Sequence, residues 1–199
     1  FNGPFLLNKA LGGPQAWDPT SIGNDFVDLL TWDTNDLATI LRTFGPFLMA
    51  MGVSKSGSLF PHLVKWGSAA EPGALPDWDF TDPTIEAGEF TFADTEKGSI
   101  VNALEMGNRF YIYKRGAIWA FEYVGGIDIF ARLKISDNTG LELKRTLCNI
   151  PTPEGDRQFF VGQDAFYLMD GIRATPILEG IFNEVFLNLV DTQPLQRTF

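Results

Sequence analysis

The chain has 199 residues, of which 45 % are hydrophobic and 14 % aromatic, and this length and composition suit one substantial core. A formal net charge of −10 and a pI of about 4.5 disfavour a protein that binds phosphate backbones, because such binding needs clustered lysine and arginine. The single cysteine excludes an internal disulfide, and no apolar run is long enough for a membrane-spanning helix. We therefore expect a protein assembled in a reducing cytosol. Because Phe1 is not methionine, we also expect one part of a longer product.

Turn residues recur about every 8–12 residues, which is the spacing of all-β domains. In the first half, the strand candidates are the apolar runs 5–7, 48–53 and 59–66, and a polar turn at 54–58 joins the last two. Two prolines and a glycine exclude 71–76 from a sheet, so this segment is predicted as a loop.

Two stretches carry a helical period. The apolar residues of 37–44 have the i, i+3, i+4, i+7 spacing of a helix, whereas the β-branched residues there favour a strand, and both alternatives stay open. The apolar stripe from Leu178 to Leu189 is stronger and predicts a short helix near the end of the chain.

In the second half, the strongest strand signal is the alternation of apolar and polar residues from Ile127 to Ile135, which predicts a half-buried strand. Asp170-Gly171 predicts a two-residue hairpin turn. Further strands are predicted at 100–104, 109–113, 117–123, 141–147, 166–169 and 172–177.

A hairpin is written twice in this half, 48 positions apart from Gly107 to Gly155, with no gap. A period of about 40–50 residues is typical of β-propeller blades. The alternative is that two unrelated hairpins resemble each other, because all hairpins alternate apolar residues around a polar turn. The repeat predicts that 109–121 and 157–169 occupy equivalent positions in neighbouring sheets.

Few residues suggest chemistry. His62 is the only histidine, no nucleophile motif accompanies it, and a structural role is predicted. Cys148 has no basic neighbour beyond Arg145 to lower its pKa, so it is predicted to be a buried hydrophobe.

The best metal candidate is the acidic cluster Asp77, Asp79, Asp82 and Glu86, because calcium prefers several carboxylate oxygens from one loop. The spacing lacks the glycine and terminal glutamate of the helix–loop–helix calcium motif, and a solvated polar face is the default interpretation.

Paired carboxylates could hydrolyse a glycosidic bond, and Glu122, Asp128 and Asp170 are the candidates. Residues 136–140 resemble a sialidase aspartate box, but the aspartate falls one place early and the expected tryptophan is missing. We therefore predict no catalytic, cofactor-binding or metal-binding residue.

Several segments, taken in order, resemble motifs of tailed-phage virion proteins. The first motif is a glycine turn followed by proline and tryptophan, at 1–3 with 14–18, and the second is a strand ending in lysine and tryptophan before Asp-Pro, at 61–68 with 72–88. The third is a pair of strands around a lysine turn that ends in Gly-Gly, at 109–126, and the fourth is the hairpin that follows, at 163–171. Together they cover most of the chain. Members of this family continue past the position equivalent to Phe199.

The turn spacing and the strand alternation predict an all-β domain over 1–199, built of antiparallel meanders with one or two short helices. The resemblance implies that the arrangement is β-propeller-like and incomplete. It further implies a non-enzymatic subunit of a phage tail or neck nozzle in the virion, assembled in the host cytoplasm, without cofactors. The implied partners are other tail or neck proteins and copies of the chain in a ring. An acidic surface around a channel would let DNA pass without binding it.

Two alternatives remain. A carbohydrate-binding or glycoside-hydrolase propeller would need two carboxylates about 5–9 Å apart in a pocket, or an aromatic platform. A cellular propeller could instead be a scaffold for protein partners.

Overall fold

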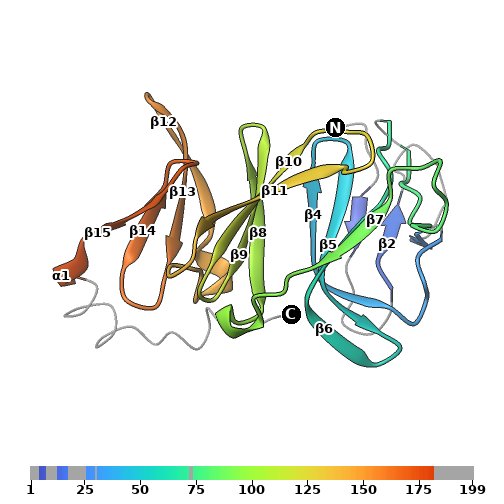
Figure 1. The fold of residues 1–199 in the computed structure, drawn as a ribbon, viewed down its shortest axis with the longest axis horizontal. Helices are drawn as coiled ribbons and strands as arrows, with labels where there is room; N and C mark the ends of the chain where they lie inside the picture. Colours follow the sequence, from blue (N-terminus) through green and yellow to red (C-terminus); the bar gives the residue numbers. More distant parts are fainter. Residues whose placement is uncertain (1–4, 8–12, 18–25, 30, 72–73, 182–199) are drawn as a thin grey trace. The chain divides into compact units, whose positions relative to one another are not determined.

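The computed structural model describes residues 5–7, 13–17, 26–29, 31–71 and 74–181 (Figure 1). In these residues nearly all of the regular secondary structure is β-strand, which makes up 52 % of the chain, and every strand pair is antiparallel. The predicted all-β class with antiparallel meanders is therefore confirmed. The chain divides into two compact units, Phe1–Ala93 (unit 1) and Asp94–Phe199 (unit 2).

Unit 1 contains a three-stranded and a four-stranded sheet, each with its strands in chain order. One of the two inner strands of the larger sheet, Phe47–Lys55, is an apolar run whose first seven residues are all buried, as expected for a strand covered on both faces. Ser56 and Gly57 both have positive φ, the conformation of a two-residue hairpin turn that matches strand twist. The three-stranded sheet consists of β1 (Phe5–Leu7), β2 (Gln15–Trp17) and β3 (Val27–Asp28). The four-stranded sheet consists of β4 (Leu37–Phe44), β5 (Phe47–Lys55), β6 (Ser58–Trp66) and β7 (Gly88–Thr91).

Unit 2 contains two four-stranded meanders, again in chain order. Short 3₁₀ turns precede the first strand of each, at Thr95–Lys97 and Lys144–Thr146. The first sheet is β8 (Ile100–Met106), β9 (Arg109–Lys114), β10 (Ile118–Tyr123) and β11 (Phe130–Ser136). The second sheet is β12 (Cys148–Thr152), β13 (Gly155–Val161), β14 (Phe166–Met169) and β15 (Ala174–Ile177), followed by α1 (Glu179–Ile181).

The repeated hairpin has the same place in both sheets of unit 2. β9 and β10 are the second and third strands of their meander, and so are β13 and β14. The register is also the same, because the pair Ile112–Trp119, moved by the 48-residue offset from Gly107 to Gly155, becomes the pair Phe160–Tyr167. The predicted equivalence of the hairpins is confirmed in strand position and register.

Segment 141–147 is not the predicted strand. It crosses from one sheet of unit 2 to the other, since the Leu141 amide donates to the Lys114 carbonyl and the Glu142 amide donates to the Val161 carbonyl, both at 2.9 Å. Leu141 and Leu143 are buried, Leu141 in the core that the two sheets share and Leu143 against Val161 of the second sheet, and neither belongs to a strand.

Hydrogen bonds and a shared core also join these two sheets. The Tyr113 hydroxyl on β9 donates to Gln158 Oε1 on β13 at 2.6 Å, and both side chains are buried. Burial raises the pKa of Tyr113 well above its ordinary value, so this hydroxyl remains a donor. The core between the sheets includes Met106, Tyr111, Tyr113, Ile118, Ala120, Leu141, Phe160, Ala165, Tyr167 and Met169.

Three further predictions are decided by the described residues. Segment 37–44, left open between helix and strand, is strand β4. The strand predicted over 127–135 begins at Phe130, and Ile127 is fully exposed in the preceding loop. The turn at Asp170-Gly171 has four residues, because Met169 pairs with Ala174.

The predicted C-terminal helix falls largely outside the described residues. Its described part is the single helical turn α1, and Leu178 has a positive φ and does not belong to it. The single domain over 1–199 and the propeller arrangement stay predictions, although successive four-stranded meanders are the units from which propellers are built.

Candidate functional site

The acidic loop of unit 1 uses its carboxylates to hold its own turns. Asp77 Oδ1 accepts the Asp79 amide at 2.9 Å, Asp79 Oδ1 accepts the Thr81 amide at 3.0 Å, and Asp82 Oδ1 accepts the Thr84 amide at 2.8 Å. These are Asx turns, in which an aspartate replaces a backbone acceptor two residues away. Hydrogen bonds from Thr31 and Thr84 lower the pKa of Asp77 and Asp82, respectively.

Calcium binding by this loop stays the alternative to a solvated polar face. In the described part of the chain, no group of three or more histidine, cysteine, aspartate or glutamate residues has the arrangement needed to hold a metal ion. Segment 77–80 is a loop. Glu86 contributes its backbone carbonyl, which accepts the Trp66 indole N–H at 2.9 Å.

A pocket of about 420 Å³ lies beside this loop, within unit 1. The β5–β6 hairpin, the segment before β4 and the acidic loop supply its walls. We call it the unit 1 pocket, and its lining residues are Thr31, Asp33, Asp36, Lys55, Ser56, Lys65, Trp78, Asp79 and Phe80.

Lys65 and Asp36 form a buried ion pair in the unit 1 pocket. Both residues are 4 % exposed, and Lys65 Nζ lies 3.9 Å from Asp36 Oδ2. Burial raises the pKa of Asp36 and lowers the pKa of Lys65, because a charge loses solvation inside the protein. The ammonium also lies 4.9 Å from the ring centre of Trp32, which places it in range for cation–π attraction.

Sequence reasoning named Asp79 as a metal candidate but missed Asp36, Lys55 and Lys65. The available signal was the lysine at position 65, between Val64 and Trp66 in an apolar strand, since a charged residue there needs a partner when buried.

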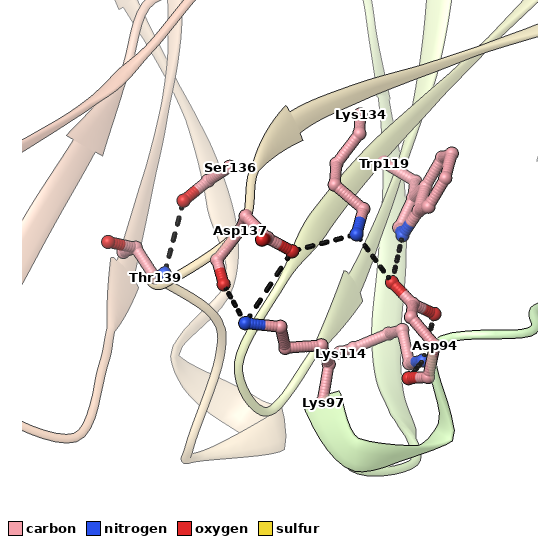
Figure 2. A network of polar contacts seen from close by, with 8 residues as sticks. All are labelled: Asp94, Lys97, Lys114, Trp119, Lys134, Ser136, Asp137 and Thr139. Carbon is pink, nitrogen blue, oxygen red and sulfur yellow. Dashed lines mark hydrogen bonds and ion pairs between the residues drawn. The ribbon is translucent and has the colours of Figure 1, made fainter.

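Unit 2 contains a second polar cluster, which connects the residues before its first sheet to the strands of that sheet (Figure 2). Asp94 accepts hydrogen bonds from Lys114 Nζ at 2.5 Å and from Trp119 Nε1 at 3.0 Å, and pairs with Lys134 Nζ at 3.1 Å. Lys134 also reaches Asp137, at 2.7 Å, and the Lys97 ammonium meets the same aspartate at 3.5 Å.

Burial divides this cluster into an inner and an outer part. The side chain of Lys114 is fully buried and that of Asp94 is 10 % exposed, whereas that of Asp137 is 56 % exposed. Burial alone would raise the pKa of Asp94, but its hydrogen bonds from Lys114, Lys134 and Trp119 together lower it. All these side chains are paired with one another, which indicates a structural role.

The segment that resembles an aspartate box belongs to this cluster. Ser136 Oγ accepts the Thr139 amide at 3.1 Å, and Asp137 is held by the lysines (Figure 2). The other candidate carboxylates also have structural partners. Glu122 pairs with Arg109 across β9 and β10 at 2.9 Å, Asp128 lies 3.8 Å from Arg132, and Asp170 accepts two amides of its own turn.

The predicted burial of Cys148 is wrong. The cysteine is exposed, because it begins the edge strand β12, whose first four residues all face solvent. His62 lies on β6 as predicted and is half-buried, and its carbonyl accepts the Phe92 amide at 3.1 Å. Its structural role stays a prediction.

Apolar side chains are exposed near the outer edge of the first sheet of unit 2. We call this region the β11 edge and define it by Tyr123, Val124, Ile127 and Leu133, which are 48, 56, 103 and 51 % exposed. Tyr123 and Leu133 lie on opposite faces of the sheet. Leu133 is paired with the buried Ala120 and so lies on the same sheet face as the core. The core face therefore continues outward to a strand where the described residues leave it uncovered.

Comparison with protein-family models gives no match, and neither does comparison with curated protein sequences. Among the described residues, no helix is long and apolar enough to cross a membrane.

Proposed function

We propose that the chain is a non-enzymatic structural subunit that functions in a larger assembly, in which its β11 edge contacts a second copy. The exposed β11 edge carries this proposal. In the described residues β11 forms a ladder with β10 alone, so its outer edge presents backbone donors and acceptors together with apolar side chains. Such an edge favours association with another chain.

The copies form a ring if the β11 edge of one copy contacts a different surface of the next copy. Such head-to-tail contacts close into a ring when the rotation between successive copies adds up to a full turn. The resemblance of the sequence to virion proteins makes a phage tail or neck the proposed location, with other tail or neck proteins as partners. Antibodies against the chain are then expected to label the tail or neck of negatively stained particles.

The assembly state of the purified chain tests the proposal. We expect light scattering after size-exclusion chromatography to give a multiple of 22.1 kDa, and Leu133→Asp to reduce the mass to that of one chain. A charge at this position opposes burial in an interface, whereas in a single chain it faces solvent. Ile172→Asp is the matched control, since Ile172 is 77 % exposed but lies outside the β11 edge. A wild-type chain that stays monomeric at every concentration tested would overturn the proposal.

The charge of the chain predicts its behaviour toward DNA. With a formal net charge of −10, the chain should not retard duplex DNA in a gel even at low salt, where electrostatic binding is strongest. Retardation that disappears as salt is added would show a basic binding surface and would contradict a passive channel wall.

A further inference from the structure

The unit 1 pocket has the size and lining of a small-molecule site. Its volume of about 420 Å³ falls within the usual range for ligand pockets, about 300–1,000 Å³. We propose that it binds a neutral saccharide unit, whose hydroxyl groups bond to its polar side chains while one face of the sugar ring packs on Phe80. The proposal is independent of assembly, because the pocket lies in unit 1 and the β11 edge in unit 2.

The pocket contains a buried donor that lacks an acceptor. Trp78 is 1 % exposed, and its indole Nε1 has no hydrogen-bond partner among the described residues. Buried N–H groups are almost always paired, so the unpaired Nε1 of this lining residue leaves one donor for a ligand or a water molecule to satisfy. Lys65 supplies a second donor group, since its ammonium lies 3.9 Å from Asp36, beyond hydrogen-bond distance.

The pocket also contains acceptors. Asp33 and Asp79 line it, and each uses Oδ1 for a turn, bonding the amides of Asn35 and Thr81 at 2.9 and 3.0 Å. The described residues donate no hydrogen bond to Oδ2 of either carboxylate. A ligand that both donates and accepts at neighbouring atoms matches this lining, and hydroxyl groups do so.

Charge narrows the ligand class further. Three aspartates and two lysines line the pocket, so its formal charge is −1 and it disfavours an anion. The same aspartates do not form a metal-binding group among the described residues. Phe80 is 46 % exposed and offers an aromatic face, on which the C–H face of a sugar ring can pack.

The backbone around Trp78 is held in place by a strained residue. Thr31 has a φ of 57°, which is unfavourable for a β-branched side chain. Its hydroxyl donates to Asp77 Oδ1 and accepts the Trp78 amide at 2.7 Å. Local strain of this kind is concentrated at binding and catalytic sites.

Saturation-transfer NMR on the full chain tests the proposal, with D-glucose, D-galactose, D-mannose and N-acetyl-D-glucosamine as probes. We expect at least one probe to bind, and Phe80→Ala and Trp78→Phe each to weaken it by about tenfold or more. Phe60→Ala is the matched control. Phe60 and Phe80 are similarly exposed and both rings lie 5.9 Å from Lys55 Nζ, but Phe80 alone of the two lines the pocket.

Three outcomes would overturn the proposal. The first is a folded wild-type chain that binds none of the four sugars at millimolar concentration. The second is equal loss of binding in Phe80→Ala and Phe60→Ala. The third is tighter binding of glucose 6-phosphate than of any neutral probe. If Trp78→Phe fails to fold, Phe80→Ala decides the result, because Phe80 is exposed and its replacement leaves the core intact.

Discussion

Replacing Asp94 with alanine is expected to lower the free energy of unfolding of unit 2 by about 3–5 kcal/mol, the usual cost of breaking a buried ion pair. The fully buried Lys114 would lose its carboxylate partner, and Trp119 Nε1 and Lys134 would lose an acceptor at the same time. The effect is measured by urea unfolding, monitored through hydrogen exchange at the amides of β9. The amides of β5 in unit 1 are the internal reference.

Asp137→Ala is the control for this variant, because it removes a carboxylate from the outer part of the same cluster (Figure 2). Ion pairs in solvent contribute little, so the urea midpoint should hardly move. Equal destabilisation by the two variants would show that burial does not determine how much an ion pair of this cluster contributes to the free energy of unfolding.

The ionisation of Asp94 predicts how the stability of unit 2 depends on pH. The folded-state pKa of Asp94 lies below its ordinary value of 3.8, so its stabilisation is complete above that pH and is lost as the pH falls through the folded-state pKa. Asp94→Asn should therefore flatten the acid limb of the stability curve of unit 2. An unchanged acid limb would assign the dependence to other carboxylates.

The fold class could be predicted because strand pairing leaves local signals in the sequence. In the repeated hairpins, apolar residues and turns alone predicted both the strand positions and the equivalence of the pairs Ile112–Trp119 and Phe160–Tyr167. The strand predicted at 141–147 is wrong because Leu141 and Leu143 are buried without a ladder partner, and the chain then forms the 3₁₀ turn Lys144–Thr146.

The contents of the site depend on contacts between residues far apart in the chain. Asp36, Lys65 and Trp78 line one pocket, yet only Lys65 stands out in the sequence, as a charge within an apolar strand, whereas Asp36 and Trp78 resemble ordinary loop residues. The burial of Cys148 was predicted from its residue type, and the structure shows that the position of its strand at a sheet edge matters more. The partners of Lys65 in space and the edge position of β12 are not local information, so no period or motif could reveal them.

Replacing Gly140 with alanine should destabilise unit 2 by about 3 kcal/mol or more, because the new methyl group would meet backbone atoms that cannot rotate away. A Cβ at this position would lie 2.2 Å from the Lys114 carbonyl oxygen and 2.4 Å from that of Arg115. Leu141, the next residue, donates its amide to the same Lys114 carbonyl and inserts its side chain between the two sheets. Moving the backbone to relieve the clash would therefore break this hydrogen bond and withdraw Leu141 from the core.

Gly116→Ala is the matched control for Gly140→Ala. Neither glycine has a left-handed φ, so the two substitutions differ only in the space around the added methyl group. At Gly116 the nearest atom is the Lys97 carbonyl oxygen at 3.5 Å, an ordinary contact, and this variant should keep the wild-type urea midpoint. Gly140→Ala should instead unfold at lower urea and lose hydrogen-exchange protection in both β9 and β13, since the crossing at 140–142 joins their sheets. Equal midpoints for the two variants would mean that the chain passes Lys114 less closely than the structure places it.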